Sequence, residues 1–439
     1  MINKIYVKVG QLKNNQLFKD SAWSLIGNVI GKGLALLAGI LVARFLGKDI
    51  YGEYGMVRNT ILTIGTFSTF GLGYTATKFV ADFKFNAPHK LSLFIHYSNK
   101  ITLIFSGMMA ISLFLFSNYI AIHLFNTSHL DRSLRLLAVL IVFNAITTTQ
   151  IGVLSGYGMF KKIAQINSVI GVLTFFFSVI LTYYYDLYGA LLALIFVQII
   201  NCGYNYMYVR KATTQFAVSE NIDTIEQKTL YKSIIRFSTP IALQEAVYSS
   251  TAWISSLLLV RFASFGDLGM YSAAMQWNAI ILFIPGILRN VILSHLSKNM
   301  NNEKRHEAIL KQTILINFFA TIVPALIVSL FSVFIARSYG NSFQGLELLI
   351  SLSVFSTVFS SISNVYAQAY MSKGLNWVML LFRTIRDVSA IVLFIVFMLY
   401  FNFDGAESMV ISHLIFSIVF LIITVLFYNK KNKRNVRVY

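Results

Sequence analysis

Five ionisable side chains lie well inside long apolar segments of this chain, more than one turn from either end, where a charge is costly. They are Lys32, Glu245, Arg383, Arg386 and Asp387. A charged group at the centre of a bilayer costs at least about 2.5–3.5 kcal/mol on insertion scales, so such residues usually face a cavity and serve a function. We therefore predict that Lys32, Arg383 and Arg386 are cavity cations that bind substrate. The alternatives are that Lys32 extends its ammonium to the membrane surface or pairs with an acid, and that both arginines lie at the headgroup level.

The two acids could instead couple transport to an ion gradient. A desolvated carboxyl group is easily neutralised, so Glu245 could bind and release a proton or hold Na⁺ during a cycle. An equally acceptable role for Glu245 is to be the counter-ion of Lys32. Asp387 follows Arg383 by four residues, which is the spacing of an ion pair on one helix face.

Uncharged polar side chains in the same apolar segments are predicted to line the cavity, although each could also join two helices. They are Asn28, Gln244, Tyr248, Asn364 and Gln368. The seven histidines form no metal-spaced pair and the single cysteine lies in an apolar segment, so neither a metal site nor a cofactor is expected. There is no phosphate-binding loop sequence for direct use of ATP, which leaves an ion gradient or consumption of the product to drive transport.

About twelve apolar blocks of some twenty residues must position these side chains. Each is long enough to cross a bilayer as a helix. The predicted spans are 21–43, 54–77, 97–117, 134–156, 163–183, 188–209, 234–260, 270–293, 312–335, 347–370, 377–400 and 406–428. The chain is 56% hydrophobic and only 12% charged, with a mean hydropathy of +0.68, so we predict an all-α integral membrane protein.

The lysines and arginines indicate the orientation of these spans. With the N-terminus in the cytosol, 26 of the 36 basic residues fall on the cytosolic side, six on the opposite side and four inside the spans. This asymmetry predicts that both termini are cytosolic and supports an even number of spans. The net charge of +19 is therefore explained by basic cytosolic loops, and no nucleic acid partner is expected.

The two halves of the chain repeat one another. When the second half is aligned with the first at a single offset, Arg44-Phe45 falls on Arg261-Phe262, Gly52 on Gly269 and Tyr54 on Tyr271. Gly158 aligns with Gly374 at almost the same offset. We predict an N-terminal lobe of six helices (1–210), a cytosolic linker (211–232) and a C-terminal lobe of six helices (233–439). Parallel repeats of this kind are typical of transporters that work by alternating access between two lobes.

The segment Trp23–Val57 resembles the opening signature of the bacterial polysaccharide flippases of the Wzx type. Its matching features are a glycine-rich first helix followed by Arg44-Phe45-Leu46-Gly47 and Tyr51-Gly52-Glu53-Tyr54. Phe70-Gly71-Leu72-Gly73 and Phe237-Ser238-Thr239-Pro240 are similar to family features as well. These flippases belong to the multidrug/oligosaccharidyl-lipid/polysaccharide exporter superfamily, which also holds the lipid II flippase and the multidrug and toxin extrusion transporters.

The resemblance implies a function for the chain as a whole. It implies a non-enzymatic flippase in the bacterial cytoplasmic (inner) membrane that carries an undecaprenyl-pyrophosphate-linked oligosaccharide, such as an O-antigen unit of lipopolysaccharide or a capsule unit. Lys32, Arg383 and Arg386 would attract the diphosphate. Membrane lipids, H⁺ or Na⁺ and the polysaccharide polymerase of the pathway are the implied partners.

Two other functions compete with this one. A multidrug exporter of the same superfamily would favour acidic lobes, whereas the groups inside the membrane here are mostly basic. A membrane-bound glycan polymerase or glycosyltransferase usually needs a large external loop, and the longest external loop here, about Ser117–Ser133, is too short for a catalytic domain.

Overall fold

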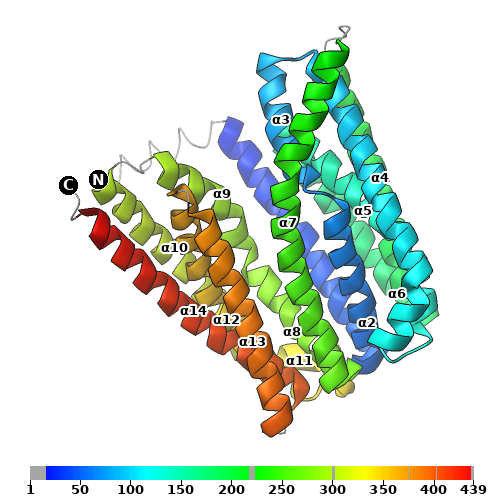
Figure 1. Cartoon of the computed structure of the whole chain (residues 1–439). Coiled ribbons are helices and arrows are strands. Elements are labelled where there is room, and N and C mark those ends of the chain that lie inside the picture. Colours follow the sequence, from blue (N-terminus) through cyan, green and yellow to red (C-terminus); the bar gives the residue numbers. More distant parts are fainter. Residues whose placement is uncertain (1–15, 217–222, 299–301, 374, 402, 437–439) are drawn as a thin grey trace. The chain divides into compact units, whose positions relative to one another are not determined.

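The computed structural model describes residues 16–216, 223–298, 302–373, 375–401 and 403–436, and these residues form helices joined by short connections, without a β-strand. The chain divides into two compact units (Figure 1). Unit 1 takes the described residues of Met1–Val42 and Val57–Ser250, and unit 2 takes those of Ala43–Met56 and Thr251–Tyr439.

Unit 1 is built around α5, which packs against α3, α4 and α6. The helices that begin before Ser250 are α2 (Gln16–Ser68), α3 (Leu72–Asn86), α4 (Lys90–Tyr119) with the π-helical turn η1 (Ile120–Leu124), α5 (Leu130–Gly156), α6 (Phe160–Phe216) and α7 (Thr224–Phe262). The apolar core at one end joins residues of α3, α4, α5 and α7, among them Leu72, Phe94, Val153 and Ile234.

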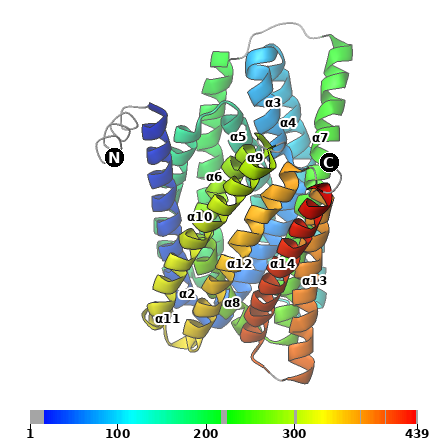
Figure 2. The same cartoon turned by 90° about the vertical axis from the view of Figure 1, so that its left-hand side faces the viewer.

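Unit 2 is built around α12, which packs against α8, α9, α10, α13 and α14 and lies among them in both views (Figures 1 and 2). Its helices are α8 (Phe265–Ile281), α9 (Phe283–Lys298), α10 (Glu303–Leu330), α11 (Ser332–Tyr339), the 3-10 turn η2 (Asn341–Phe343), α12 (Leu346–Ser372), α13 (Asn376–Tyr400) and α14 (Gly405–Val436). The central helices of the two units, α5 and α12, begin and end at the offset that aligns Gly158 with Gly374, which matches the predicted repeat.

The predicted fold class is confirmed. Seven helices of the described part are long and apolar enough to cross a membrane. Two of them, α2 and α6, kink at Gly47 and at Tyr185-Asp186. The helix α6 therefore holds two predicted spans, and α2 holds one span and the first part of the next, which continues in α3. The other three spans correspond to α7, to α8 with α9, and to α13. All twelve predicted spans therefore coincide with helices.

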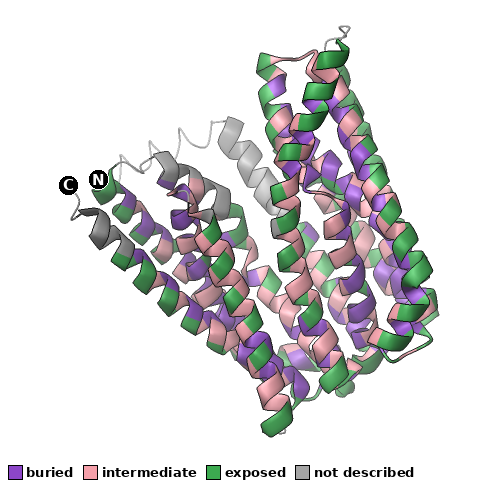
Figure 3. Ribbon diagram, in the orientation of Figure 1, coloured by how far each residue is buried: buried purple, intermediate pink, exposed green. Residues whose placement is uncertain are grey.

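The outer faces of the helices carry large apolar side chains, as bilayer-spanning helices must. Leu115, Phe334 and Tyr183 are 69%, 75% and 66% exposed, and exposed positions run along the helices in Figure 3. In water such surfaces would drive association, but lipid chains solvate them. Small hydroxyl residues are buried instead, for example Thr102, whose hydroxyl lies 2.9 Å from that of Thr149.

Three of the predicted spans are interrupted by breaks that the hydropathy pattern does not show. One of them, 312–335, is interrupted at Phe331, between α10 and α11. The span 54–77 is broken between α2 and α3, where Phe70 and Gly71 have positive φ values of 48° and 67°. The break lets Gly71 approach α7, since a Cβ atom there would lie 3.0 Å from the carbonyl oxygen of Ser238. The span 270–293 is broken between α8 and α9, just before Pro285, which has no N–H to continue the helical bonds.

The predicted linker 211–232 is largely helical where it is described. The helix α6 continues to Phe216 and α7 already begins at Thr224. Leu230 is 6% exposed and belongs to the core of unit 1, which explains why this polar segment folds as a helix. The compact units therefore do not share the boundaries of the predicted lobes, because α7 belongs to unit 1 as far as Ser250. The division into six-helix lobes stays a prediction.

The repeat-related glycines face one another inside unit 2. A Cβ atom on Gly52 would collide with the carbonyl oxygen of Phe265, and one on Gly269 would collide with that of Lys48. Lys48 and Phe265 are themselves equivalent positions of the repeat, at the offset that aligns the two glycines, so the two collisions are symmetric. The segment Ala43–Met56 of the first repeat thus packs against its counterpart of the second repeat. Gly374, the predicted counterpart of Gly158, lies outside the described residues.

Candidate functional site

Lys32 lies on the surface of unit 1, beside a tight contact between two helices. A Cβ atom on Gly31 would lie 2.7 Å from the carbonyl oxygen of Asn167 in α6, and one on Gly171 would collide with Gly31 itself. This glycine contact turns the Gly31 face of α2 toward α6. Because successive residues of a helix are about 100° apart, the next side chain, Lys32, is directed away from the contact and is exposed.

Glu245 and Tyr248 lie on α7, in the part that belongs to unit 1. Glu245 is partly buried and Tyr248 is 46% exposed. Lys32 and Glu245 form no ion pair, although both side chains are described, so the role of Glu245 as counter-ion of Lys32 is not realised here. The side chains of Asn28 and Gln244, which the sequence places in the same cavity, lie outside the described residues.

Arg386 and Asp387 form an ion pair in α13. The guanidinium Nη2 and Nε of Arg386 lie 2.7 and 2.8 Å from Oδ1 of Asp387, and the side chains are 20% and 13% exposed. The spacing predicts a pair of Asp387 with Arg383; the pair that the structure shows is made by the neighbouring arginine. Arg386 also lies 5.3 Å from the ring centre of Phe420. The charge of Arg386 is thus compensated inside unit 2. Arg383 is partly buried on the same helix.

His413 of α14 belongs to the same neighbourhood and was missed by the sequence reasoning. It interacts electrostatically with Asp387 and Arg386, and its ring stacks on that of Tyr271 with centres 6.3 Å apart. Its Nε2 is buried and has no hydrogen-bond partner among the described residues. The available signal was a histidine in the middle of the last apolar block.

The two polar residues predicted on α12 differ in their surroundings. Asn364 is exposed on unit 2, and its role in lining a cavity stays a prediction. Gln368 is only 2% exposed and lies next to Ala369 and Tyr370, which belong to a core cluster. In this structure Gln368 is therefore an interior residue.

The predicted site residues are thus divided between the two units. Lys32, Glu245 and Tyr248 belong to unit 1, and Asn364, Arg383, Arg386 and Asp387 belong to unit 2. The structure brings Arg386 and Asp387 into contact. Within the described part of the chain no three His, Cys, Asp or Glu side chains are grouped so that they could hold a metal ion.

Comparisons with known proteins agree with this architecture. A family described as "Polysaccharide biosynthesis protein" matches residues 17–300. No protein among the curated sequences matches the chain.

Solved structures of transporters are similar in fold at low sequence identity. An inward-facing multidrug resistance MATE family transporter of the MOP superfamily is 15% identical with a TM-score of 0.76, covering 92% of this chain and 94% of its own. The lipid II flippase MurJ, in an inward closed conformation, is 16% identical with a TM-score of 0.72, covering 93% and 87%. A MOP superfamily transporter from Pyrococcus furiosus is 15% identical with a TM-score of 0.69, covering 96% and 97%.

Proposed function

The chain belongs to the polysaccharide biosynthesis protein family, and on this premise we propose that it is a flippase for lipid-linked oligosaccharides. Its cargo is an undecaprenyl-pyrophosphate-linked repeat unit of O-antigen or capsule, moved across the bacterial cytoplasmic membrane by alternating access. The family match over residues 17–300 carries the proposal. The fold that the chain shares with MATE transporters and with the lipid II flippase supports a transporter without naming its cargo.

Lys32 is the residue best suited to bind the diphosphate of such a cargo. It is exposed in the first helix and forms no ion pair with any described side chain. A phosphate would therefore meet an uncompensated ammonium group. Arg383 is the second cation of this function, and Arg386, whose charge Asp387 compensates, positions α13 and contributes less to binding.

Glu245 is the candidate for coupling to H⁺ or Na⁺. It is a partly buried acid within a predicted span, and it forms no ion pair with Lys32. Exchange of a proton or a sodium ion at this carboxylate would link the cycle to an ion gradient. Asp387 is less suited to this role because Arg386 already holds its carboxylate.

The membrane orientation follows from the basic residues of the loops. The chain is a multi-pass membrane protein, and the excess of Lys and Arg places both termini in the cytosol of a bacterial cell. The polymerase that consumes the flipped repeat unit would be a partner on the outer side.

The fold likeness to MATE transporters keeps a multidrug exporter as the second function. Deleting the gene in a glycan-producing bacterium separates the two. A flippase predicts that lipid-linked repeat units accumulate on the cytosolic face and that surface glycan is lost. Unaltered surface glycan together with increased sensitivity to drugs would contradict the flippase and support the exporter.

A further inference from the structure

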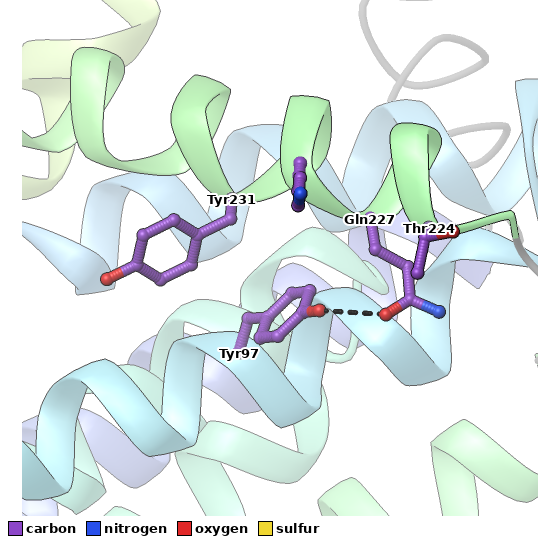
Figure 4. A pocket seen from close by; sticks show the side chains of 5 residues that line it. Tyr97, Thr224, Gln227 and Tyr231 are labelled. Carbon is purple, nitrogen blue, oxygen red and sulfur yellow. Dashed lines mark hydrogen bonds between the residues drawn. The ribbon is translucent and has the colours of Figure 1, made fainter.

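Unit 1 contains a pocket that none of the roles above uses. It lies where α4 meets the first turns of α7 and has a volume of about 400 Å³. Five residues line it, namely Tyr97, Thr224, Gln227, Lys228 and Tyr231 (Figure 4). This volume lies within the range of small-molecule sites, about 300–1,000 Å³.

The start of α7 is fixed against α4, so the pocket is a built feature. Leu230 and Ile234 are 6% and 0% exposed in the core cluster that also holds Leu91. Beside the pocket Lys90 Nζ lies 2.6 Å from Oε1 of Glu226. Apolar burial and an ion pair thus hold the same two helices together.

Two tyrosine rings form its walls. The hydroxyl of Tyr97 donates a hydrogen bond of 3.1 Å to Oε1 of Gln227 (Figure 4). The rings of Tyr97 and Tyr231 meet edge to face with their centres 5.7 Å apart. Tyr231 is 44% exposed, so its ring is accessible to a ligand.

Among the described residues that line this pocket, Lys228 is the only charged one. It is exposed and makes no ion pair with another described residue. The nearest acid along the helix, Glu226, is engaged elsewhere, since the hydrogen bond from Lys90 lowers the pKa of its carboxyl group and keeps it ionised at neutral pH. The pocket is therefore positive and suited to an anion.

The position of the pocket along the helices corresponds to the lipid headgroups. Tyr97 is the first residue of the predicted span 97–117, and Tyr231 lies just before the predicted span 234–260. Tyrosine side chains are enriched at this level, and the basic residues assign this end to the cytosolic leaflet, whose anionic lipids attract lysines.

We propose that this pocket binds the phosphate-bearing headgroup of a membrane lipid. Lys228 compensates the phosphate charge, and the rings of Tyr97 and Tyr231 pack against the carbon atoms beside it. The lipid is either an anionic phospholipid or a polyprenyl pyrophosphate. The site extends the proposed flippase function but does not depend on it, because the phospholipid alone would satisfy its chemistry.

Lipid binding to the purified full-length protein tests the site without a transport assay. Native mass spectrometry in detergent measures the binding of phosphatidylglycerol, with zwitterionic phosphatidylcholine for comparison. Lys228→Gln should weaken phosphatidylglycerol binding about fivefold, the factor expected for one lysine near an anionic lipid. Tyr231→Leu, which removes the ring and keeps an apolar side chain, should weaken it as well.

Lys232→Gln is the matched control. Lys232 is an exposed lysine one turn further along α7 and does not line the pocket, so its loss should change binding less than about twofold. Equal effects of Lys228→Gln and Lys232→Gln would mean diffuse attraction and would overturn the site. Equal binding of phosphatidylcholine and phosphatidylglycerol would also overturn it. Unchanged thermal unfolding of each variant shows that the comparison concerns folded protein.

A competition identifies the source of the headgroup. One outcome is that undecaprenyl pyrophosphate displaces phosphatidylglycerol from the parent protein but not from Lys228→Gln. In that case the pocket binds the lipid carrier of the proposed cargo. If phosphatidylglycerol is retained, the pocket holds a phospholipid. If deleting the gene leaves surface glycan unaltered while the purified protein still binds lipid at this pocket, the flippase function is contradicted and the pocket stays in place.

Discussion

Gly52 and Gly269 occupy equivalent positions in the two repeats and pack against each other across the interior of unit 2. A Cβ atom on either glycine would meet a backbone carbonyl near the other glycine, that of Phe265 in one direction and that of Lys48 in the other. The glycine at this position of each repeat therefore allows a close contact between two backbones. Because the contact is symmetric, both Gly52 and Gly269 are required.

Gly52→Ala is expected to destabilise the protein by about 1–3 kcal/mol, the usual cost of overpacking a tight contact. Gly269→Ala should do the same, and the double variant should cost less than the sum, because one shift of the backbone relieves both collisions. Gly286→Ala is the control, since a Cβ atom there has nothing within 4 Å. Thermal unfolding in detergent measures all four. Equal stability of Gly52→Ala and Gly286→Ala would refute the contact.

Arg386→Ala should lower the free energy of unfolding by about 3 kcal/mol, because it leaves the largely buried carboxylate of Asp387 without its partner. Removing Asp387 as well should restore part of the loss, and the cycle of single and double variants measures the coupling. Lys311→Ala breaks an exposed pair of similar length with Glu307 (2.8 Å, side chains 74% and 55% exposed) and should cost less than about 1 kcal/mol. Additive effects in the Arg386 cycle would show that the pair contributes nothing.

Lys32→Ala should reduce export of the lipid-linked repeat unit about tenfold at equal protein level, the effect of losing one charge-assisted contact to phosphate. Lys32→Arg should keep most of the activity, because it keeps the charge. Arg58→Ala removes another exposed cation of α2 and should leave export within about twofold. Surface glycan and the cytosolic pool of repeat units give the readout. Export that is unchanged in Lys32→Ala removes this lysine from the substrate site.

Glu245→Gln should abolish the dependence of export on the ion gradient while the protein folds normally, because the amide neither binds a proton nor carries a negative charge. Glu303→Gln, at the exposed start of α10, should keep that dependence. Transport into vesicles with imposed H⁺ or Na⁺ gradients identifies the ion. A Glu245→Gln variant that still responds to the gradient would end the role of this carboxylate in coupling.

Several parts of the fold could be predicted because they depend on composition and local pattern. About twenty apolar residues in succession must form a helix in lipid, since no water is present to satisfy the backbone, and all twelve spans were found in this way. The breaks after Ser68 and Ile281 could not be found from hydropathy, because apolar residues continue through both. They depend on positive φ values at Phe70 and Gly71 and on the missing N–H of Pro285.

For the charged residues, too, the sequence determined some features and the tertiary structure determined others. The sequence by itself determined that Lys32, Glu245, Arg383, Arg386 and Asp387 lie in apolar segments, that the two halves of the chain repeat one another and that basic loops orient it. Only the tertiary structure decided that Arg386 holds Asp387, that His413 from another helix lies beside them and that Gly52 meets Gly269. Periodicity and hydropathy describe one helix at a time, whereas the contacts of His413 and of the two glycines depend on how helices distant in sequence are rotated and packed against one another. The pair of Arg386 with Asp387 lies within one helix and depends on side-chain conformations that periodicity does not specify.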